Sequence, residues 1–181
     1  MPDTIKSGVG NGYLVEVTKN NKLRAYCTNE SEISYESETN GQAYTWSNVS
    51  YNYTAGDTIL LIKNTSATKN LLIQTVAVSG DTATTATIHL PNCTTPTGTV
   101  VTGVNLNRQS GNTAEATAKA DETTNTQANI ITTILINGST TMRCPVEGAI
   151  VLGLNDCIAV DFTTDGGAAN VTVRGYYHEV C

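Results

Sequence analysis

The stretch "AGDTILLIKNTSATKNLLIQTVAVSGDTATTATIHL", residues 55–90, decides the fold class. It holds three short runs rich in Thr, Val, Ile and Leu. The turn signal "AG" precedes the first run, the polar segment "NTSAT" separates the first from the second, and "SGD" separates the second from the third. Branched side chains suit the pleated surface of a strand, and Gly, Asn and Asp favour tight turns. The stretch therefore predicts successive β-strands with no helix between them.

The same pattern continues on both sides of this stretch. Further strand candidates are "AYTWSNVSYNY", "TGTVVTGVNLN", "ANIITTILI", "TTMRCPV", "GAIVLGL", "DCIAVDF" and "NVTVRGYYHEV". Asn137-Gly138 is a strong signal for a tight hairpin turn. About eight or nine short strands with turn residues between them predict an all-β sandwich or barrel, and a jelly roll of two four-stranded sheets fits this number.

Residues 1–42 differ from the rest of the chain. "GYLVEVT" and "KLRAYC" are two short strand candidates joined by "KNN", and the polar segment "TNESEISYESETNGQ" with four Glu follows them. We interpret residues 1–42 as an N-terminal arm or peripheral hairpin, and residues 43–181 as the jelly-roll-like β-sandwich.

Composition limits the classes of partner. The 181 residues include 31 Thr, only 14% are charged, and the net charge is −6. An acidic chain argues against nucleic acid and anionic membranes, which attract clustered Lys and Arg. No run of eighteen apolar residues occurs, and the start "MPDTIKSGVGNG" lacks the apolar centre of a secretory signal. We therefore expect no membrane span and synthesis in a cytoplasm.

Residues 107–127, "NRQSGNTAEATAKADETTNTQ", contain no large apolar side chain. Alternation of Ala114, Ala116, Ala118 and Ala120 with polar residues fits a strand with a thin alanine face. The segment "TAEATAKADE" also fits a short helix, and a solvated loop is a third alternative. Because alanine buries little surface, we predict that the four alanines need a neighbouring subunit to pack against.

No residue set in the sequence announces a catalytic, cofactor-binding or metal site. His89 and His178 are the two histidines, and a lone histidine in a strand is usually structural. Asp161 and Asp165 in "DFTTDGG" offer oxygen ligands for Ca²⁺, but their spacing lacks the alternating ligands of a calcium loop and better fits a hairpin turn. We expect neither enzymatic activity nor a cofactor.

The five cysteines, Cys27, Cys93, Cys144, Cys157 and Cys181, are odd in number and include no CxxC pair. This spacing disfavours a zinc site and a redox motif. Two alternatives remain open at this point, which are buried thiols and a disulfide formed late in an oxidising environment.

The densest aromatic cluster consists of Tyr44, Trp46, Tyr51 and Tyr53. Aromatic rings with a polar handle, set on a sheet, suit the flat faces of sugars. The cluster therefore predicts either a glycan-binding platform or half-buried strand aromatics.

The segments "LLIKNTS", "GVNLNR" and "LGLNDCIAVD" together resemble the small β-sandwich virion proteins of tailed bacteriophages, some of which are head decoration or cement proteins. The similarity covers about residues 43–177. It implies a jelly-roll-like fold, a homotrimer on the exterior of an icosahedral head, contact with the major capsid protein, and no enzymatic role. It supplies no active-site residue.

These observations give two main hypotheses for the function, beside a third, an enzyme such as a polysaccharide depolymerase, for which no set of residues stands out. The first is a capsid decoration protein that stabilises the head through subunit–subunit and subunit–shell contacts. Each contact is weak, but a trimer makes several at once, and this raises its overall affinity for the shell. The alternative is a tail- or fibre-associated module that binds a receptor or glycan through the aromatic cluster.

Overall fold

The computed structural model describes residues 16–17, 23–24, 31–51, 53–92, 95–123, 126–164 and 167–179. For residues 16–17 and 23–24, and for Tyr51 and Glu147, it describes the backbone alone. The chain forms two compact units, Met1–Ser31 and Glu32–Cys181. In the first unit, strands β1 (Glu16–Val17) and β2 (Leu23–Arg24) pair antiparallel.

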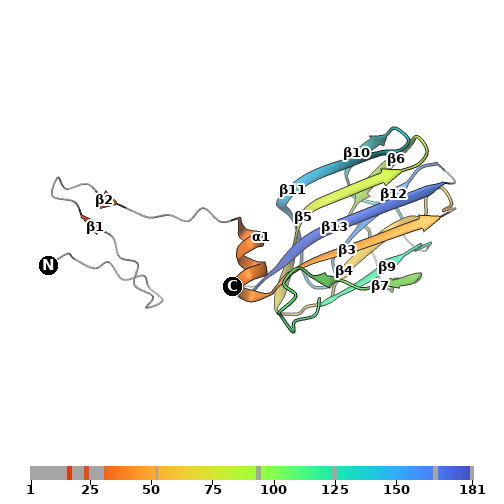
Figure 1. Ribbon diagram of the computed structural model, residues 1–181. Helices are drawn as coiled ribbons and strands as arrows, with labels where there is room; N and C mark the ends of the chain where they lie inside the picture. Colours follow the sequence, from red (N-terminus) through yellow and green to blue (C-terminus); the bar gives the residue numbers. More distant parts are fainter. Residues whose placement is uncertain are drawn as a thin grey trace. The chain divides into compact units, whose positions relative to one another are not determined.

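The second unit consists of two antiparallel sheets packed face to face (Figure 1), which confirms the predicted all-β sandwich. The six-stranded sheet has the order β10-β6-β12-β4-β9-β7, and the five-stranded sheet has the order β11-β5-β13-β3-β8. The strands are β3 (Ala43–Tyr51), β4 (Thr58–Asn64), β5 (Lys69–Gly80), β6 (Thr84–His89), β7 (Thr99–Val101), β8 (Val104–Asn105), β9 (Ala116–Ala120), β10 (Ile130–Ile136), β11 (Thr140–Leu152), β12 (Cys157–Phe162) and β13 (Ala168–Glu179).

The pairing of the eight main strands is that of a jelly roll. The first of them, β3, pairs with the last, β13, and β4 pairs with β12. Strand β5 pairs with β11, and β6 pairs with β10. Successive main strands alternate between the sheets except at β6 and β10, which are hairpin-like partners in one sheet. The connection between these two strands supplies β7, β8 and β9, which extend both sheets at the opposite edge.

The hydrophobic core lies between the two sheets. The six-stranded sheet contributes residues such as Ile62 and Val160, and the five-stranded sheet contributes Val76 and Val173, all of them fully buried or nearly so. Burial of one such side chain is worth about 1.5–3 kcal/mol relative to exposure. Alternation along each strand thus aims one apolar row inward, as the period-two pattern of the sequence predicts.

The outer face of the six-stranded sheet is buried as well at its central strands. All six residues of β12 are buried. Val160 belongs to the core between the sheets, so Ala159 and Asp161 face the other way. The connection between β6 and β10 reaches this outer side, where the Ala128 N–H donates a hydrogen bond of 3.4 Å to His89 Nδ1. Strands covered on both faces read as continuous buried runs, as "DCIAVDF" does.

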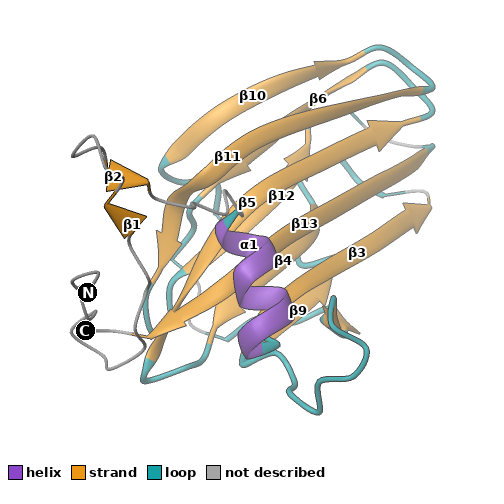
Figure 2. Cartoon of the chain, turned by 60° about the vertical axis from the view of Figure 1, so that its left-hand side comes forward, coloured by secondary structure: helices purple, strands orange, loops and turns teal. Residues whose placement is uncertain are grey.

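A short helical segment precedes the sandwich (Figure 2, purple). It consists of helix α1 (Glu32–Tyr35) and a wider π-type turn, η1 (Glu36–Asn40), and ends at Gly41, whose φ of 61° suits glycine. The Tyr176 hydroxyl donates a hydrogen bond of 2.9 Å to Glu32 Oε2 and fastens the segment to β13. In the described part of the chain, no helix is long and apolar enough to cross a membrane.

Candidate functional site

The alanine-rich stretch forms strand β9, which confirms the strand alternative over the helix. It lies between β4 and β7. Ala118 and Ala120 are buried, and Ala114 and Ala116 pack against the core cluster of the same chain. This corrects the expectation that these four alanines await a neighbouring subunit, because their methyl groups face their own sandwich.

The aromatic residues of β3 belong to the core. Tyr44 and Trp46 have no exposed surface, and their ring centroids lie 6.0 Å apart. Tyr53 is also buried, edge-on to Phe162 with centroids 5.4 Å apart. The side chain of Tyr51 lies outside the described residues. This corrects the predicted glycan platform, because Tyr44, Trp46 and Tyr53 offer no ring face to a sugar.

His89 and Asp161 meet on the covered outer side of the six-stranded sheet. His89 Nε2 lies 2.8 Å from Asp161 Oδ2, and Thr58 Oγ1 donates to Asp161 Oδ1 over 2.8 Å. The Ala128 N–H donates to His89 Nδ1 at 3.4 Å, so Nδ1 is the acceptor and Nε2 faces the carboxylate. Both side chains are shielded from solvent. The pair therefore joins β6 to β12 and is closed to a substrate.

The remaining candidate ligands do not form a site in the described residues. Asp165 lies outside them, and His178 is exposed near the end of β13. No group of three or more His, Cys, Asp and Glu within the described ranges is placed to hold a metal ion. Cys157 is disulfide-bonded and Cys144 is a free thiol, while Cys27, Cys93 and Cys181 are not among the described residues.

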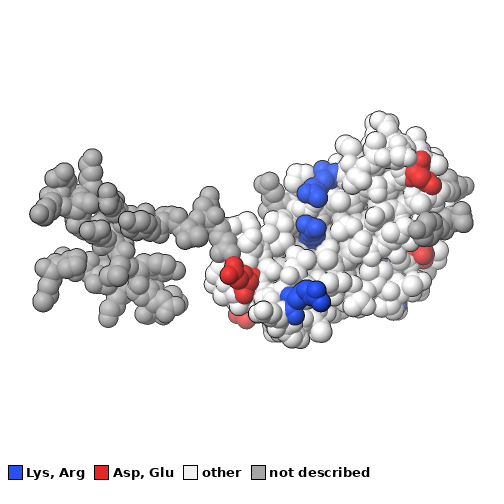
Figure 3. All heavy atoms as spheres, in the orientation of Figure 1, with Lys and Arg blue, Asp and Glu red and all other residues white. Residues whose placement is uncertain are grey.

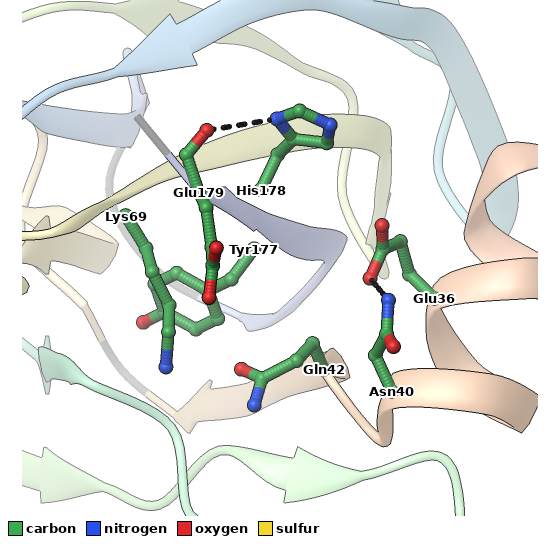
Figure 4. Close-up of a pocket in the computed structure, with 7 residues that line it drawn as sticks. All are labelled: Glu36, Asn40, Gln42, Lys69, Tyr177, His178 and Glu179. Carbon is green, nitrogen blue, oxygen red and sulfur yellow. Dashed lines mark hydrogen bonds between the residues drawn. The ribbon is translucent and has the colours of Figure 1, made fainter. Parts of the chain in front are cut away.

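A hollow lies where the helical segment meets the ends of β5 and β13 (Figure 4). Its volume is about 530 Å³. In the close-up the Glu179 carboxylate extends into the hollow and the His178 ring turns away from it. The lining residues are Glu36, Asn40, Gln42, Lys69, Tyr177, His178 and Glu179.

Most polar groups around this hollow already have partners. Asn40 Nδ2 donates to Glu36 Oε2 over 2.7 Å, and Lys69 Nζ pairs with Glu115 at 2.5 Å. The hydrogen bond from Lys69 lowers the pKa of Glu115, and a bond from Ser66 lowers it further. Burial raises the pKa of the Tyr177 hydroxyl further above neutral pH, so this group is a hydrogen-bond donor and no base. The hollow is therefore a polar junction and holds no poised acid–base pair.

The outer face of the five-stranded sheet is a broad hydroxyl-rich surface that carries two arginines. Arg143 on β11 lies opposite Ala77, and Ala77 lies opposite Thr172 on β13. Arg174 on β13 lies opposite Thr75, two positions along the strand from Thr172. Arg143 and Arg174 are exposed and border a shallow hollow of about 180 Å³ over β5.

The charge on this face is one-sided. Figure 3 shows Lys and Arg atoms in a column across the front strands of Figure 1, with Asp and Glu atoms toward the margins. Among the described residues, neither Arg143 nor Arg174 has an ion-pair partner. An unpaired guanidinium presents a planar fork of N–H donors that fits a carboxylate. This surface can therefore accept acidic groups of a flat partner.

Sequence reasoning did not single out Arg143 and Arg174. Each lies in an alternating segment, "TTMRCPV" and "NVTVRGYY", where period two predicts that the arginine points away from the neighbouring apolar residues. What the sequence lacks is the register that places β11 and β13 on either side of β5.

Comparison with known proteins yields no relative, since no family model, curated protein or solved structure matches the chain significantly. The fold and the surfaces described above are therefore the basis for its function.

Proposed function

We propose that this chain is a virion structural protein of a tailed bacteriophage, which decorates the head by binding the major capsid protein on the shell exterior. The observation that carries the proposal is the open outer face of the five-stranded sheet with Arg143 and Arg174. Jelly rolls recur in viral capsid domains, and a flat face suits a flat shell better than it suits a small substrate. The resemblance of the sequence to virion proteins agrees with this role.

The proposed role depends on many weak contacts that act together. Two arginines and a row of hydroxyl groups give each copy a modest contact, since an exposed ion pair contributes only about 0–1 kcal/mol. A homotrimer presents three such faces to a repeating lattice, and the linked contacts then add as avidity. Acidic groups on the major capsid protein are the partners that this face requires.

The test is binding of the purified full chain to heads of the phage that encodes it, measured by co-sedimentation. The double variant Arg143→Ala/Arg174→Ala should bind about tenfold more weakly or worse, since each arginine loses charge-assisted hydrogen bonds. Lys119→Ala is the matched control, because this cation lies on β9 of the other sheet and should leave binding unchanged. Wild-type binding should also weaken as salt rises.

Imaging of the same particles separates this proposal from its alternative. Gold-labelled antibody against the chain should mark the head. Label confined to the tail or fibres would favour the receptor-binding role, and absence of label together with absence of co-sedimentation would refute both.

A further inference from the structure

The exposed large apolar side chains concentrate at two edges of the sandwich. Within the described residues there are eleven such side chains, and eight of them lie on edge strands or directly beside one. Leu135 on β10 is 77% exposed and Val100 on β7 is 68% exposed, so both are more open than most side chains of their size. One edge carries Ile130, Ile131, Leu135, Met142 and Val151, and the other carries Val100, Val104 and Leu106.

The two edges lie on opposite sides of the molecule. Strands β10 and β7 are the two ends of the six-stranded sheet, and β11 and β8 are the two ends of the five-stranded sheet. Strands β10 and β11 border each other, while β7 and β9 lie near β3, the neighbour of β8. Each copy of the chain therefore carries two different apolar edges, the β10–β11 edge on one side and the β7–β8 edge on the other.

Neither β10 nor β7 carries a charged side chain or a proline to keep its free edge from pairing. Natural sheets blunt exposed edges with Lys, Pro or inward charges. The sequences of β10 (IITTILI) and β7 (TVV) contain no charged residue and no proline. By contrast β11 carries Arg143 and Pro145. Large apolar side chains exposed along a free strand edge that carries no charge favour association with another chain.

We propose that copies of this chain associate head to tail, with the β10–β11 edge of one copy against the β7–β8 edge of the next, in a closed ring. A twofold dimer that joined like edges would cover only one of the two apolar edges. A head-to-tail contact covers both, and closure of the ring leaves no free edge for further growth.

The small area of one edge contact explains why a ring, in which each copy makes two such contacts, is favoured over a dimer with one. Seven residues at about 3.3 Å each make β10 roughly 23 Å long, and two sheets about 10 Å apart with their outer side chains make an edge roughly 20 Å thick. One contact then buries on the order of 1,000 Å² in total, near the lower limit for a stable interface. In a ring each copy is held by two contacts. A ring of three rests on the proposed function, whereas the head-to-tail contact does not.

Two single variants test the contact. Leu135→Lys places a charge on the β10 edge, and Val100→Lys places one on the β7 edge. Each variant alone should sediment as a monomer at concentrations where the wild type forms the ring, because every contact then contains one charged edge. Val49→Lys is the matched control, since Val49 is an exposed valine on β3 inside the five-stranded sheet and its variant should keep the wild-type mass.

An equimolar mixture of the two variants gives the decisive reading. Head-to-tail contact predicts a heterodimer, because the intact β10 edge of Val100→Lys meets the intact β7 edge of Leu135→Lys.

Circular dichroism should show the wild-type strand content for both, and Ile131→Lys replaces Leu135→Lys if the latter is unfolded. A monomeric wild type, an unaffected Val100→Lys variant, or a mixture without heterodimer would overturn the inference. Head binding is a separate measurement, so failure of either proposal is recognisable on its own.

Discussion

Asn64 joins the two sheets through a single buried amide. Its Nδ2 donates to the carbonyl oxygens of Lys69 and Leu152, each over 2.9 Å. Its Oδ1 accepts a hydrogen bond of 3.0 Å from the Ser66 N–H. Asn64 ends β4 in the six-stranded sheet, whereas Lys69 and Leu152 belong to strands of the five-stranded sheet. One side chain therefore satisfies three backbone groups at a turn between the layers.

We predict that Asn64→Ala lowers the free energy of unfolding by about 2–4 kcal/mol, since it leaves buried carbonyl and amide groups without partners. Urea denaturation followed by circular dichroism measures the change. Asn170→Ala is the control, because Asn170 is exposed on β13 and its loss should cost less than about 0.5 kcal/mol. Equal effects of the two substitutions would contradict the bridging role of Asn64.

The connection that carries β7, β8 and β9 is the element that distinguishes this jelly roll. It widens both sheets at one edge and reaches the outer side of the six-stranded sheet at His89 on β6. Gly103, between β7 and β8, lies so close to the core that a Cβ there would approach Trp46 Nε1 to 2.5 Å. Trp46 is the only tryptophan of the chain, so its fluorescence reports on this contact.

Gly103→Ala should destabilise the sandwich by about 1–3 kcal/mol, because the added methyl group overpacks a site that cannot expand without shifting Trp46. Thermal unfolding followed by tryptophan fluorescence measures both the loss and the local change. Gly111→Ala serves as the counterpart, since nothing lies within 4 Å of a Cβ at that position. An unchanged midpoint and emission spectrum for Gly103→Ala would show that the connection does not pack as described.

The elements were predictable from the sequence to the extent that they depend on local periodicity. Period two in residues 114–121 indicated the strand that became β9, and turn signals separated most of the main strands. The face that each strand buries was harder to predict. Tyr44 and Trp46 lie on one face of β3 and Val49 on the other, so both faces read as apolar until the opposite sheet selects one.

Contacts between segments that are distant along the chain could not be predicted from the sequence. His89 and Asp161 meet because the jelly roll makes β6 and β12 neighbours, and no local pattern encodes that register. The same holds for Arg143 and Arg174, which border one hollow only because β5 separates their strands. The predicted alanine contact failed for a related reason, since the partner that the stretch needed was β4 of the same chain.

At the scale of the whole molecule, buried tyrosines make the sandwich sensitive to alkali. Burial raises the pKa of Tyr176 to about 12, and its hydrogen bond to Glu32 adds to this rise. Burial also raises the pKa of Tyr44 and of Tyr177. Each hydroxyl holds its proton more tightly in the folded chain than in the unfolded one. The stability that they contribute is complete below pH 10 and is lost as the pH rises toward 12.

We therefore predict that the free energy of unfolding falls between pH 10 and pH 12 and that Tyr176→Phe makes this fall shallower. The variant should cost about 1 kcal/mol at neutral pH, where it loses only the hydrogen bond to Glu32. Urea titrations at a series of pH values measure both quantities. Parallel curves for the wild type and the variant would show that Tyr176 does not contribute to the alkaline loss.

The place of β13 in the sheet has a consequence for biosynthesis. This strand lies between β5 and β3 at the centre of its sheet, yet it follows every other strand of the sandwich along the chain. A ribosome adding about 5–20 residues per second needs roughly 7–27 s to proceed from Ala43 to Glu179. Throughout that interval β3 lacks its main partner strand, and Tyr44 lacks the ring of Tyr177 against which it packs in the folded chain. The five-stranded sheet of the nascent polypeptide thus cannot be completed until translation delivers its central strand.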